Sequence, residues 1–389
     1  MKNNLIKIFE ETIISNHDTG IIINKLISLN IINLDDLVEE IIKTNNSEYI
    51  YELAYRVKGA PIDKLTDAII KTGDAKYIFE FAFLIKNADI DKLTDAIIRT
   101  ENIKCIFEFA KYIKNTPIDK LADVIIEKGN LSYIYQFALE VKNAPIDKLT
   151  NAIIKSNNAK YIYYFAKKIK NAPIDDLIDA ISQSKDSNKA EHIFFLAEDI
   201  NNSTKHNKDT RINRLAEAIN KNVTYDSAEF IYYFARDVEN APIDILTVAI
   251  CKTNNARFIY DFASFIKGAS IEMLTKAICE TNNAEYIYDF ALTIKGASIE
   301  MLTDAIINTD DIEYIIKFAK FIKNAPVDKL QEYISKSEKY LKLIEEENYK
   351  TLIDLVKSNN YEQIEENKKE FATIFNDNKP KKLIKKKIK

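Results

Sequence analysis

The chain has 389 residues, of which 47% are hydrophobic and 29% are charged, the balance of a water-soluble folded protein. No uncharged apolar run approaches the roughly 18 residues of a membrane-spanning helix, and the N-terminus turns acidic before a signal-type apolar stretch could form. We therefore expect a cytoplasmic protein. The three cysteines, Cys105, Cys251 and Cys279, are too few and too odd in number to predict a disulfide framework.

Residues 1–17 are expected to form an N-terminal capping helix on apolar side chains such as Leu5 and Phe9. A repeat follows this segment. The motif Tyr49-Ile-Tyr-Glu-Leu-Ala54 recurs with its alanine at positions 82, 110, 138, 166, 197, 235, 263, 291 and 319, so that the step is 28 residues except for 31 and 38 on either side of residue 197. A second block, first seen at residues 60–70, recurs in register between the copies.

Both blocks predict helices. In the first block Ile50, Leu53, Ala54 and Val57 stand at i, i+3, i+4 and i+7, on one helical face. A capping residue precedes the first helix, at Asn46, Asp74, Asn102, Asn130, Asn158, Asn255, Asn283 and Asp311. A residue suited to the left-handed conformation ends it, at Gly59, Asn87, Asn115, Asn143, Asn171, Asn240, Gly268, Gly296 and Asn324. Proline opens most copies of the second helix, at Pro61, Pro117, Pro145, Pro173, Pro242 and Pro326.

The first helix needs cover on two sides. Tyr77 and Phe79 lie about 160° apart around it, flanking the apolar stripe, and so wide an apolar arc must be buried by the preceding and the following unit. The sequence therefore predicts an all-α fold, an α-solenoid of about ten or eleven two-helix 28-residue repeats with terminal capping helices. It resembles the broad α-solenoid class of TPR, HEAT, armadillo and ankyrin-type arrays over roughly residues 18–336, with a period shorter than the roughly 33–34 residues of ankyrin and TPR.

The predicted organisation comprises regular repeats at 18–181, irregular repeats at 182–228 with an inserted loop at 201–210, regular repeats at 229–336, C-terminal capping helices at 337–378 and a basic tail at 379–389. The inserted loop is either a functional protrusion or a tolerated insertion.

No motif in the sequence predicts a catalytic or metal-binding site. The three histidines, His17, His192 and His206, are scattered, and no phosphate-loop, dinucleotide, zinc-protease or hydrolase motif is present. We expect a protein that is not an enzyme and that holds no cofactor and no metal. A catalytic site near His206 would have only the inserted loop in its favour.

Charged residues recur in two rows. Lysines stand at the end of the first helix, at Lys58, Lys86, Lys114, Lys142, Lys170, Lys267, Lys295 and Lys323, and acids stand in the first turn of the second helix, starting with Asp63. Each sign suits the helix dipole. The lysine row could instead follow a phosphate backbone. The acids oppose that interpretation, because the chain has a net charge of −4 and becomes more negative without the seven lysines of 379–389.

The first helix varies most at the position two before its alanine, which carries Glu52, Glu80, Glu108, Gln136, Tyr164, Phe195, Tyr233, Asp261, Asp289 and Lys317 in turn. We expect this position to point away from the core. Three successive copies there carry the aromatic residues Tyr164, Phe195 and Tyr233, which either form a contact surface or are covered by the 201–210 loop.

The favoured hypothesis is a monomeric, non-catalytic scaffold or adaptor that binds a protein through the first helices. Tyr164, Phe195 and Tyr233 would anchor the partner, and the acidic residues Glu52, Glu80 and Glu108 would favour a basic one. The alternative is nucleic-acid binding through the lysine row and the tail residues Lys381, Lys382, Lys385, Lys386 and Lys387. Such a tail could also be a solvated segment, touch an anionic membrane or act as a localisation signal.

Overall fold

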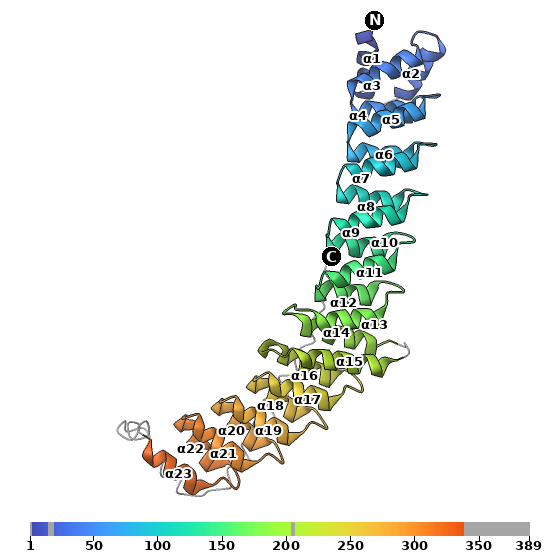
Figure 1. Cartoon of the computed structure of the whole chain (residues 1–389). Helices are drawn as coiled ribbons and strands as arrows, with labels where there is room; N and C mark the ends of the chain where they lie inside the picture. Colours follow the sequence, from blue (N-terminus) through green and yellow to red (C-terminus); the bar gives the residue numbers. More distant parts are fainter. Residues whose placement is uncertain (1, 15–18, 204–206, 338–389) are drawn as a thin grey trace. The chain divides into compact units, whose positions relative to one another are not determined.

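The computed structural model describes residues 2–14, 19–203 and 207–337. These residues form 23 α-helices and one short 3₁₀ helix, η1, with no strand among them (Figure 1). The expectation of an all-α fold is confirmed for this part of the chain. By its internal contacts the chain divides into two compact units, residues 1–189 and residues 190–389, which are called unit 1 and unit 2 below.

Unit 1 contains α1 (Lys2–Ile14), α2 (Thr19–Ser28), α3 (Leu34–Thr44), α4 (Ser47–Arg56), α5 (Ile62–Thr72), α6 (Ala75–Leu84), α7 (Ile90–Arg99), α8 (Ile103–Tyr112), α9 (Ile118–Glu127), α10 (Leu131–Glu140), α11 (Ile146–Lys155), α12 (Ala159–Lys168) and α13 (Ile174–Gln183). Helices α4, α6, α8, α10 and α12 correspond to the first block of the sequence repeat and begin 28 residues apart.

Unit 2 contains α14 (Lys189–Asn201), which begins at the last residue of unit 1, α15 (Lys208–Lys221), η1 (Tyr225–Ser227), α16 (Ala228–Asp237), α17 (Ile243–Lys252), α18 (Ala256–Phe265), α19 (Ile271–Glu280), α20 (Ala284–Thr293), α21 (Ile299–Asn308), α22 (Ile312–Phe321) and α23 (Val327–Lys336). Helices α16, α18, α20 and α22 carry the first block and also begin 28 residues apart. The even-numbered helices from α4 to α22 are called the first helices below, and the odd-numbered helices from α5 to α23 are called the second helices.

Adjacent helices pack in the manner of helical repeats within each unit. In unit 1, α6 packs against α7, which follows it in the chain, and against α4 and α8, the first helices before and after it. In unit 2, α20 packs in the same way against α21, α18 and α22. Figure 1 shows the helices of each unit succeeding one another in chain order. A first helix is therefore covered on both sides by its neighbours.

The predicted caps of the first helices are confirmed. The side chain of Asn46 accepts a hydrogen bond from the backbone N–H of Tyr49 at 3.1 Å. The predicted residues Asp74, Asn102, Asn130, Asn158, Asn255, Asn283 and Asp311 cap their helices in the same way. Each cap satisfies a backbone donor that has no partner inside the helix, and this defines where the helix begins.

The predicted ends of the first helices are displaced. Helix α4 ends at Arg56, Val57 is extended with φ −96° and ψ 120°, and the left-handed residue Gly59 with φ 81° follows two residues later. Val57 is 5% exposed, so the early end gives the core another apolar side chain. Lys58 consequently lies beyond the helix and not in its last turn.

The prolines also lie one residue earlier than predicted. Pro61 is the residue before α5, and its carbonyl oxygen accepts the first helical hydrogen bond from Leu65 N–H at 3.1 Å. Proline lacks a backbone N–H and its φ is restricted. The cap position, like the first helical position, requires no N–H donor and accepts this φ. Such differences of one residue at helix ends leave the fold unchanged.

The irregular segment is more helical than the sequence suggests. Helix α14 continues to Asn201 and α15 begins at Lys208, so both ends of the predicted 201–210 loop lie in helices. Residues 204–206, with His206 among them, lie outside the described residues, as do residue 1, residues 15–18 and most of the predicted C-terminal segments 337–378 and 379–389.

The core is built from the same positions in successive copies. Nearly every first helix places a phenylalanine one residue before its alanine where it is fully buried, at Phe81, Phe109, Phe137, Phe165, Phe234, Phe262, Phe290 and Phe318. The fourth residue of several second helices is a fully buried leucine, as in Leu65, Leu93 and Leu121. Among the described residues, no helix is long and apolar enough to cross a membrane.

Replacing Phe137 by alanine should lower the free energy of unfolding by about 3–5 kcal/mol, because removing a fully buried ring leaves a cavity in the core. Leu139 on the same helix is 47% exposed, and Leu139→Ala should cost less than about 0.5 kcal/mol. Urea unfolding followed by circular dichroism measures both variants, and equal losses would contradict the assigned core.

Candidate functional site

Aromatic rings connect successive first helices. The ring three residues before the alanine of one helix meets the ring five residues before the alanine of the next, and the two residues lie 26 positions apart in the chain. In unit 1 these pairs are Tyr51–Tyr77 at 5.9 Å between ring centroids and Phe107–Tyr133 at 5.8 Å. In unit 2 they are Tyr232–Phe258, Tyr260–Tyr286 and Tyr288–Tyr314, at 6.1, 6.0 and 6.0 Å. All five pairs are tilted, a favourable geometry for aromatic rings.

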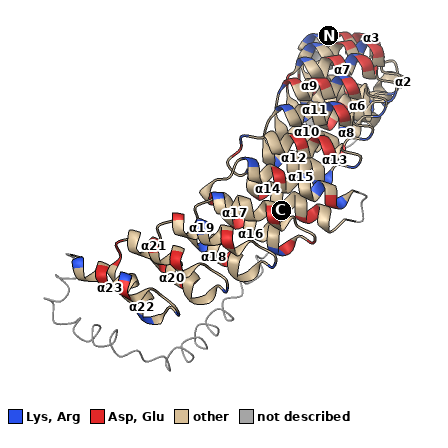
Figure 2. Ribbon diagram, turned by 60° about the horizontal axis from the view of Figure 1, so that its bottom comes forward, with Lys and Arg blue, Asp and Glu red and all other residues tan. Residues whose placement is uncertain are grey.

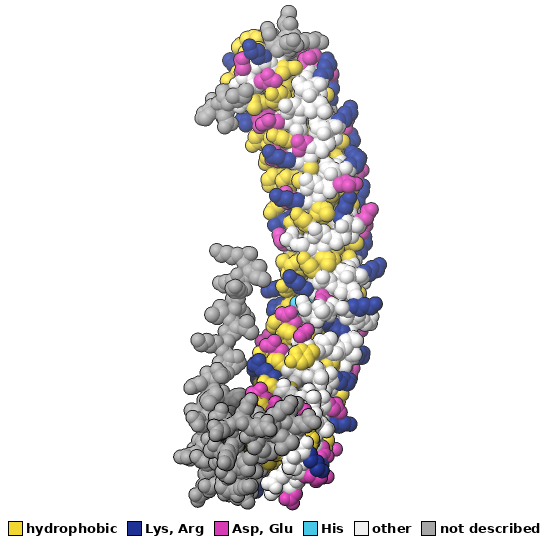
Figure 3. All heavy atoms as spheres, turned by 90° about the vertical axis from the view of Figure 1, so that its left-hand side faces the viewer, with side chains coloured by type: hydrophobic (Ala, Val, Ile, Leu, Met, Phe, Trp, Pro, Cys, Tyr) yellow, Lys and Arg dark blue, Asp and Glu magenta, His cyan; other side chains and the backbone are white. Residues whose placement is uncertain are grey.

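Unit 1 exposes a row of apolar side chains at the C-terminal ends of its first helices. The row consists of Tyr55, Phe83, Leu84, Tyr112 and Leu139, with exposed fractions of 53, 54, 43, 49 and 47%, and is called the aromatic strip below. It extends over α4, α6, α8 and α10, and each of these helices packs against the next. Figure 3 shows hydrophobic side chains gathered in a band on one face of unit 1, in the upper half of the view, with single charged side chains between them.

The strip is ordered by contacts with the rings beneath it. Tyr55 stacks on Tyr51 at 5.7 Å with an interplanar angle of 9°, and Phe83 stacks on Phe79 at 5.9 Å with an angle of 8°. Tyr112 on α8 meets Phe79 on α6 at 6.5 Å. The exposed rings are therefore held by their neighbours with one face toward solvent, so a partner could bind them at a low cost in side-chain entropy.

Tyr164, Phe195 and Tyr233 are half-buried. Tyr164 lies on α12, in unit 1, and its ring centroid is 6.1 Å from that of Tyr135 and 6.4 Å from that of Tyr161. Phe195 and Tyr233, in unit 2, are brought together by Phe194, whose ring lies 5.4 and 6.1 Å from theirs. Each of the three rings is part of the aromatic packing of its own unit.

Glu52, Glu80 and Glu108 are also half-buried, and each has a basic partner on its own helix. Glu52 forms an ion pair with Arg56, and Glu80 and Glu108 lie 3.9 Å from the ammonium groups of the lysines four residues earlier, Lys76 and Lys104. These three acids therefore offer no unpaired negative charge to a partner.

In unit 2 two copies carry an aspartate at this position, and the two aspartates differ in their surroundings. Asp261 on α18 lies 3.9 Å from Arg257, again four residues earlier, but in α20 the residue four before Asp289 is Glu285. No hydrogen bond or ion pair reaches the Asp289 carboxylate from the described residues. Burial, and to a smaller extent the charge of Glu285, raises the pKa of Asp289 to about 6, while Lys317 opposes the shift.

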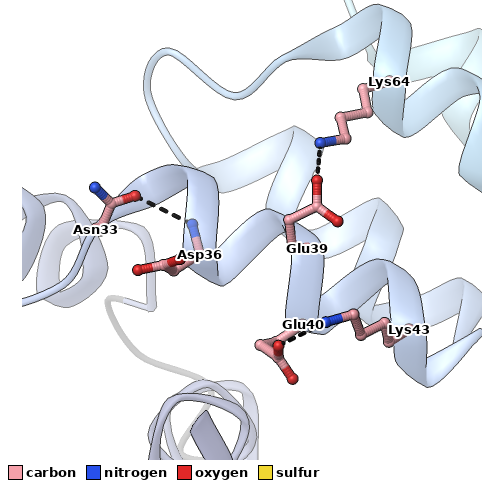
Figure 4. Close-up of polar contacts among 6 residues, drawn as sticks. All are labelled: Asn33, Asp36, Glu39, Glu40, Lys43 and Lys64. Atoms are coloured by element: carbon pink, nitrogen blue, oxygen red, sulfur yellow. Dashed lines mark hydrogen bonds and ion pairs between the residues drawn. The ribbon is translucent and has the colours of Figure 1, made fainter. Parts of the chain in front are cut away.

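A row of ion pairs joins α3 to α5, the first of the second helices, and continues through α7 and α9 to α11. Lys64 on α5 pairs with Glu39 on α3, and Figure 4 shows this contact together with the Asn33 cap and the Lys43–Glu40 pair. Further along unit 1 the pairs are Lys92–Asp67 at 2.9 Å, Lys120–Asp95, and Lys148–Asp123 at 2.9 Å. Figure 2 shows acidic and basic segments alternating over α7, α9 and α11. Such exposed pairs each contribute little stability, and they leave this face nearly neutral.

The predicted lysine row lies in the loops after the first helices. Lys58, Lys86, Lys114, Lys142, Lys170, Lys267, Lys295 and Lys323 are exposed, and none of them forms an ion pair with a described residue. The tail residues Lys381, Lys382, Lys385, Lys386 and Lys387 lie outside the described residues.

The thiols have surroundings that disfavour reactivity. Burial raises the pKa of Cys251 and of Cys279 to about 11 in each case, so both stay protonated near neutral pH. Among the described residues no three His, Cys, Asp or Glu side chains are arranged to hold a metal ion.

Sequence reasoning did not find the aromatic strip, because it compared copies only at the position two before the alanine. The signal lies one and two residues after the alanine, where Tyr55, Phe83, Tyr112 and Leu139 are apolar. The next copies carry charged residues there, such as Lys167, and an exposed apolar residue returns at Phe265. The sequence comparison shows that the position of Asp289 varies between copies. It does not consider the residue four before it, where Glu285 replaces the basic residue of several other copies.

No protein-family model matches the chain, and no curated protein matches it. Among solved structures, a chain from the work "Computational Design of Self-Assembling Cyclic Protein Homooligomers" is 16% identical to this one, over 86% of this chain and 92% of the other, with a TM-score of 0.09. A TM-score this low supports no conclusion about fold or function.

Asp289→Asn should stabilise the protein near neutral pH. Because the folded pKa of about 6 lies above the ordinary value of 3.8, the native state binds more protons between these values and stability falls as pH rises through that window. At pH 7.5 the variant should gain about 1 kcal/mol, a figure reduced for solvent screening. The gain should vanish below about pH 4.

Urea unfolding at pH 7.5 and at pH 4 measures this difference, with the exposed Glu300→Gln on α21 as the matched loss of one charge. A stability gain in Glu300→Gln as large as that in Asp289→Asn would contradict a specific cost at Asp289.

Proposed function

We propose that the chain is an α-solenoid of about ten or eleven two-helix 28-residue repeats with terminal capping helices, and that it acts as a non-catalytic scaffold or adaptor. In this proposal it works as a monomer in the cytoplasm and binds another protein through its first helices. The 28-residue spacing of the first helices within each unit and the aromatic contacts between them support the repeat architecture.

The observation that carries the proposal is the aromatic strip. Four successive first helices each present a large apolar side chain to solvent, with about half of its surface exposed. Scattered exposed apolar residues are normal on any protein, but a contiguous row on neighbouring helices is typical of a contact surface. Tyrosine and phenylalanine are common anchors in such surfaces, because a rigid ring buries much area for little lost entropy.

Tyr164, Phe195 and Tyr233 take a secondary part in this proposal. Their rings are half-buried against neighbouring rings, so they offer less free surface than the strip. They are best suited to extend a contact that the strip anchors.

Nucleic-acid binding is the second candidate, and it is favoured by the eight exposed lysines that form no ion pair within the described part of the chain. The acids in the first turn of the second helices, such as Asp63 and Asp91, are exposed as well and would repel phosphates near the lysine row. We therefore favour a protein partner.

Replacing Tyr55, Phe83 and Tyr112 together by serine should remove the captured partner, because three ring anchors are lost from one contact surface. The measurement is affinity capture from extract at high salt, where charge attraction is screened, with quantitative mass spectrometry of the bound proteins. At least one abundant captured protein should fall about tenfold or more, while helicity by circular dichroism stays unchanged.

The matched control replaces three exposed apolar residues outside the first helices, Tyr225, Met273 and Met301, by serine. It should capture the same proteins as the unaltered chain. If both variants capture one set of proteins, the strip is not a contact surface. Capture of nucleic acid at low salt that is lost on deleting residues 379–389 would favour the second candidate instead.

A further inference from the structure

Asp289 lies among tyrosines on the first helices of unit 2. Tyr286 and Tyr288 are on α20 beside it, and Tyr314 is on α22. Burial is the main cause of the raised pKa of each of these three phenols, and the charge of Asp289 adds a smaller contribution. The rings of Tyr288 and Tyr314 are 6.0 Å apart and tilted by 56°. The carboxylate therefore lies in aromatic surroundings on a half-buried part of the first-helix surface.

This carboxylate differs from its counterparts in forming no ion pair with a described residue. Glu80, Glu108 and Asp261 each have a basic residue four positions earlier on their own helix. In α20 that position is Glu285, which adds a second negative charge. Burying half of a charged group lowers the stability of the fold unless an ion pair or hydrogen bond compensates, and none does so from the described residues. A function would explain why this residue stands there.

The charged groups that act on the Asp289 carboxylate are few. Glu285 on α20 is repulsive, and Lys317 on α22 is attractive. The Lys317 ammonium is already engaged, at 2.6 Å from Glu313 and 4.4 Å from the centre of the Tyr314 ring. Helices α18, α19 and α21 also pack against α20, and none of them contributes a charge to Asp289. The carboxylate is thus left available for a cation from outside.

We propose that Asp289 and the tyrosines around it form a receptor for an arginine side chain of the bound protein. This inference rests on the proposed function and adds a chemical requirement on the partner. A guanidinium group fits because it donates two parallel hydrogen bonds to a carboxylate and stacks on aromatic rings. A tyrosine face also attracts a cation by its quadrupole.

A metal ion fits this place poorly. One carboxylate without other ligands does not make a calcium or magnesium site, since those ions take six or more oxygen ligands. A lysine ammonium would satisfy the charge, but it cannot donate the paired hydrogen bonds and it is more strongly hydrated. Arginine uses both the carboxylate and the rings.

The test uses the full chain and a synthetic probe, an acetylated and amidated peptide of the sequence Trp-Gly-Arg-Gly. Because the chain contains no tryptophan, selective excitation reports the peptide alone. A second peptide carries citrulline in place of arginine, which keeps the shape and removes the charge. The arginine peptide should bind about tenfold more tightly than the citrulline peptide.

Asp289→Asn should abolish this preference, and Glu300→Gln, which removes an exposed acid from α21, should keep it. Affinity for the arginine peptide should also fall between pH 7.5 and pH 5 in the unaltered chain, because protonation removes the charge of Asp289, and it should not fall in Asp289→Asn. Two results would overturn the proposed receptor. One is that the unaltered chain does not prefer the arginine peptide, and the other is that Glu300→Gln loses the preference as fully as Asp289→Asn. That result would leave the aromatic strip untouched, since the strip is tested by capture on variants of unit 1.

Discussion

The whole architecture depends on short helices that cover one another. Most first helices have ten residues, fewer than an isolated helix needs to be stable in water. Each is apolar over a wide arc, and each gains its stability from the helices before and after it in the chain. The ring pairs spaced 26 residues apart, such as Phe107–Tyr133 and Tyr260–Tyr286, are the direct contacts through which one copy covers the next. Their loss would expose apolar surface on two helices at once.

This arrangement assigns stability to a few recurring positions and leaves the others free to vary. The buried phenylalanine one residue before the alanine and the ring contacts between copies perform the same task in successive copies, so other positions of the first helix are free to differ. Unit 1 uses that freedom to expose rings beside its loops, as at Tyr55 and Phe83. Unit 2 uses it to hold a half-buried carboxylate that forms no ion pair with a described residue, at Asp289. One pattern of helix packing can thus present different chemistry in the two units without a change in the core positions.

Much of the fold could be predicted because it is local. Caps such as Asn46 and left-handed residues such as Asn87 follow from rules that act within a few residues. The exposed surface could not be predicted as well, because it depends on which side chain the next copy supplies. Tyr51 and Tyr55 are both aromatic and lie on one helix, yet Tyr51 is 8% exposed and Tyr55 53%. Tyr51 meets the ring of Tyr77, which the next first helix, α6, supplies.

The contact between successive first helices is tested most directly by a double-mutant cycle on Phe107 and Tyr133, each replaced by leucine alone and together. Their rings lie 5.8 Å apart on α8 and α10. Urea unfolding should give a coupling free energy of about 0.5–1.5 kcal/mol, since the aromatic pair contributes beyond the area that each ring buries. Strictly additive losses would contradict the claim that these rings hold one copy to the next.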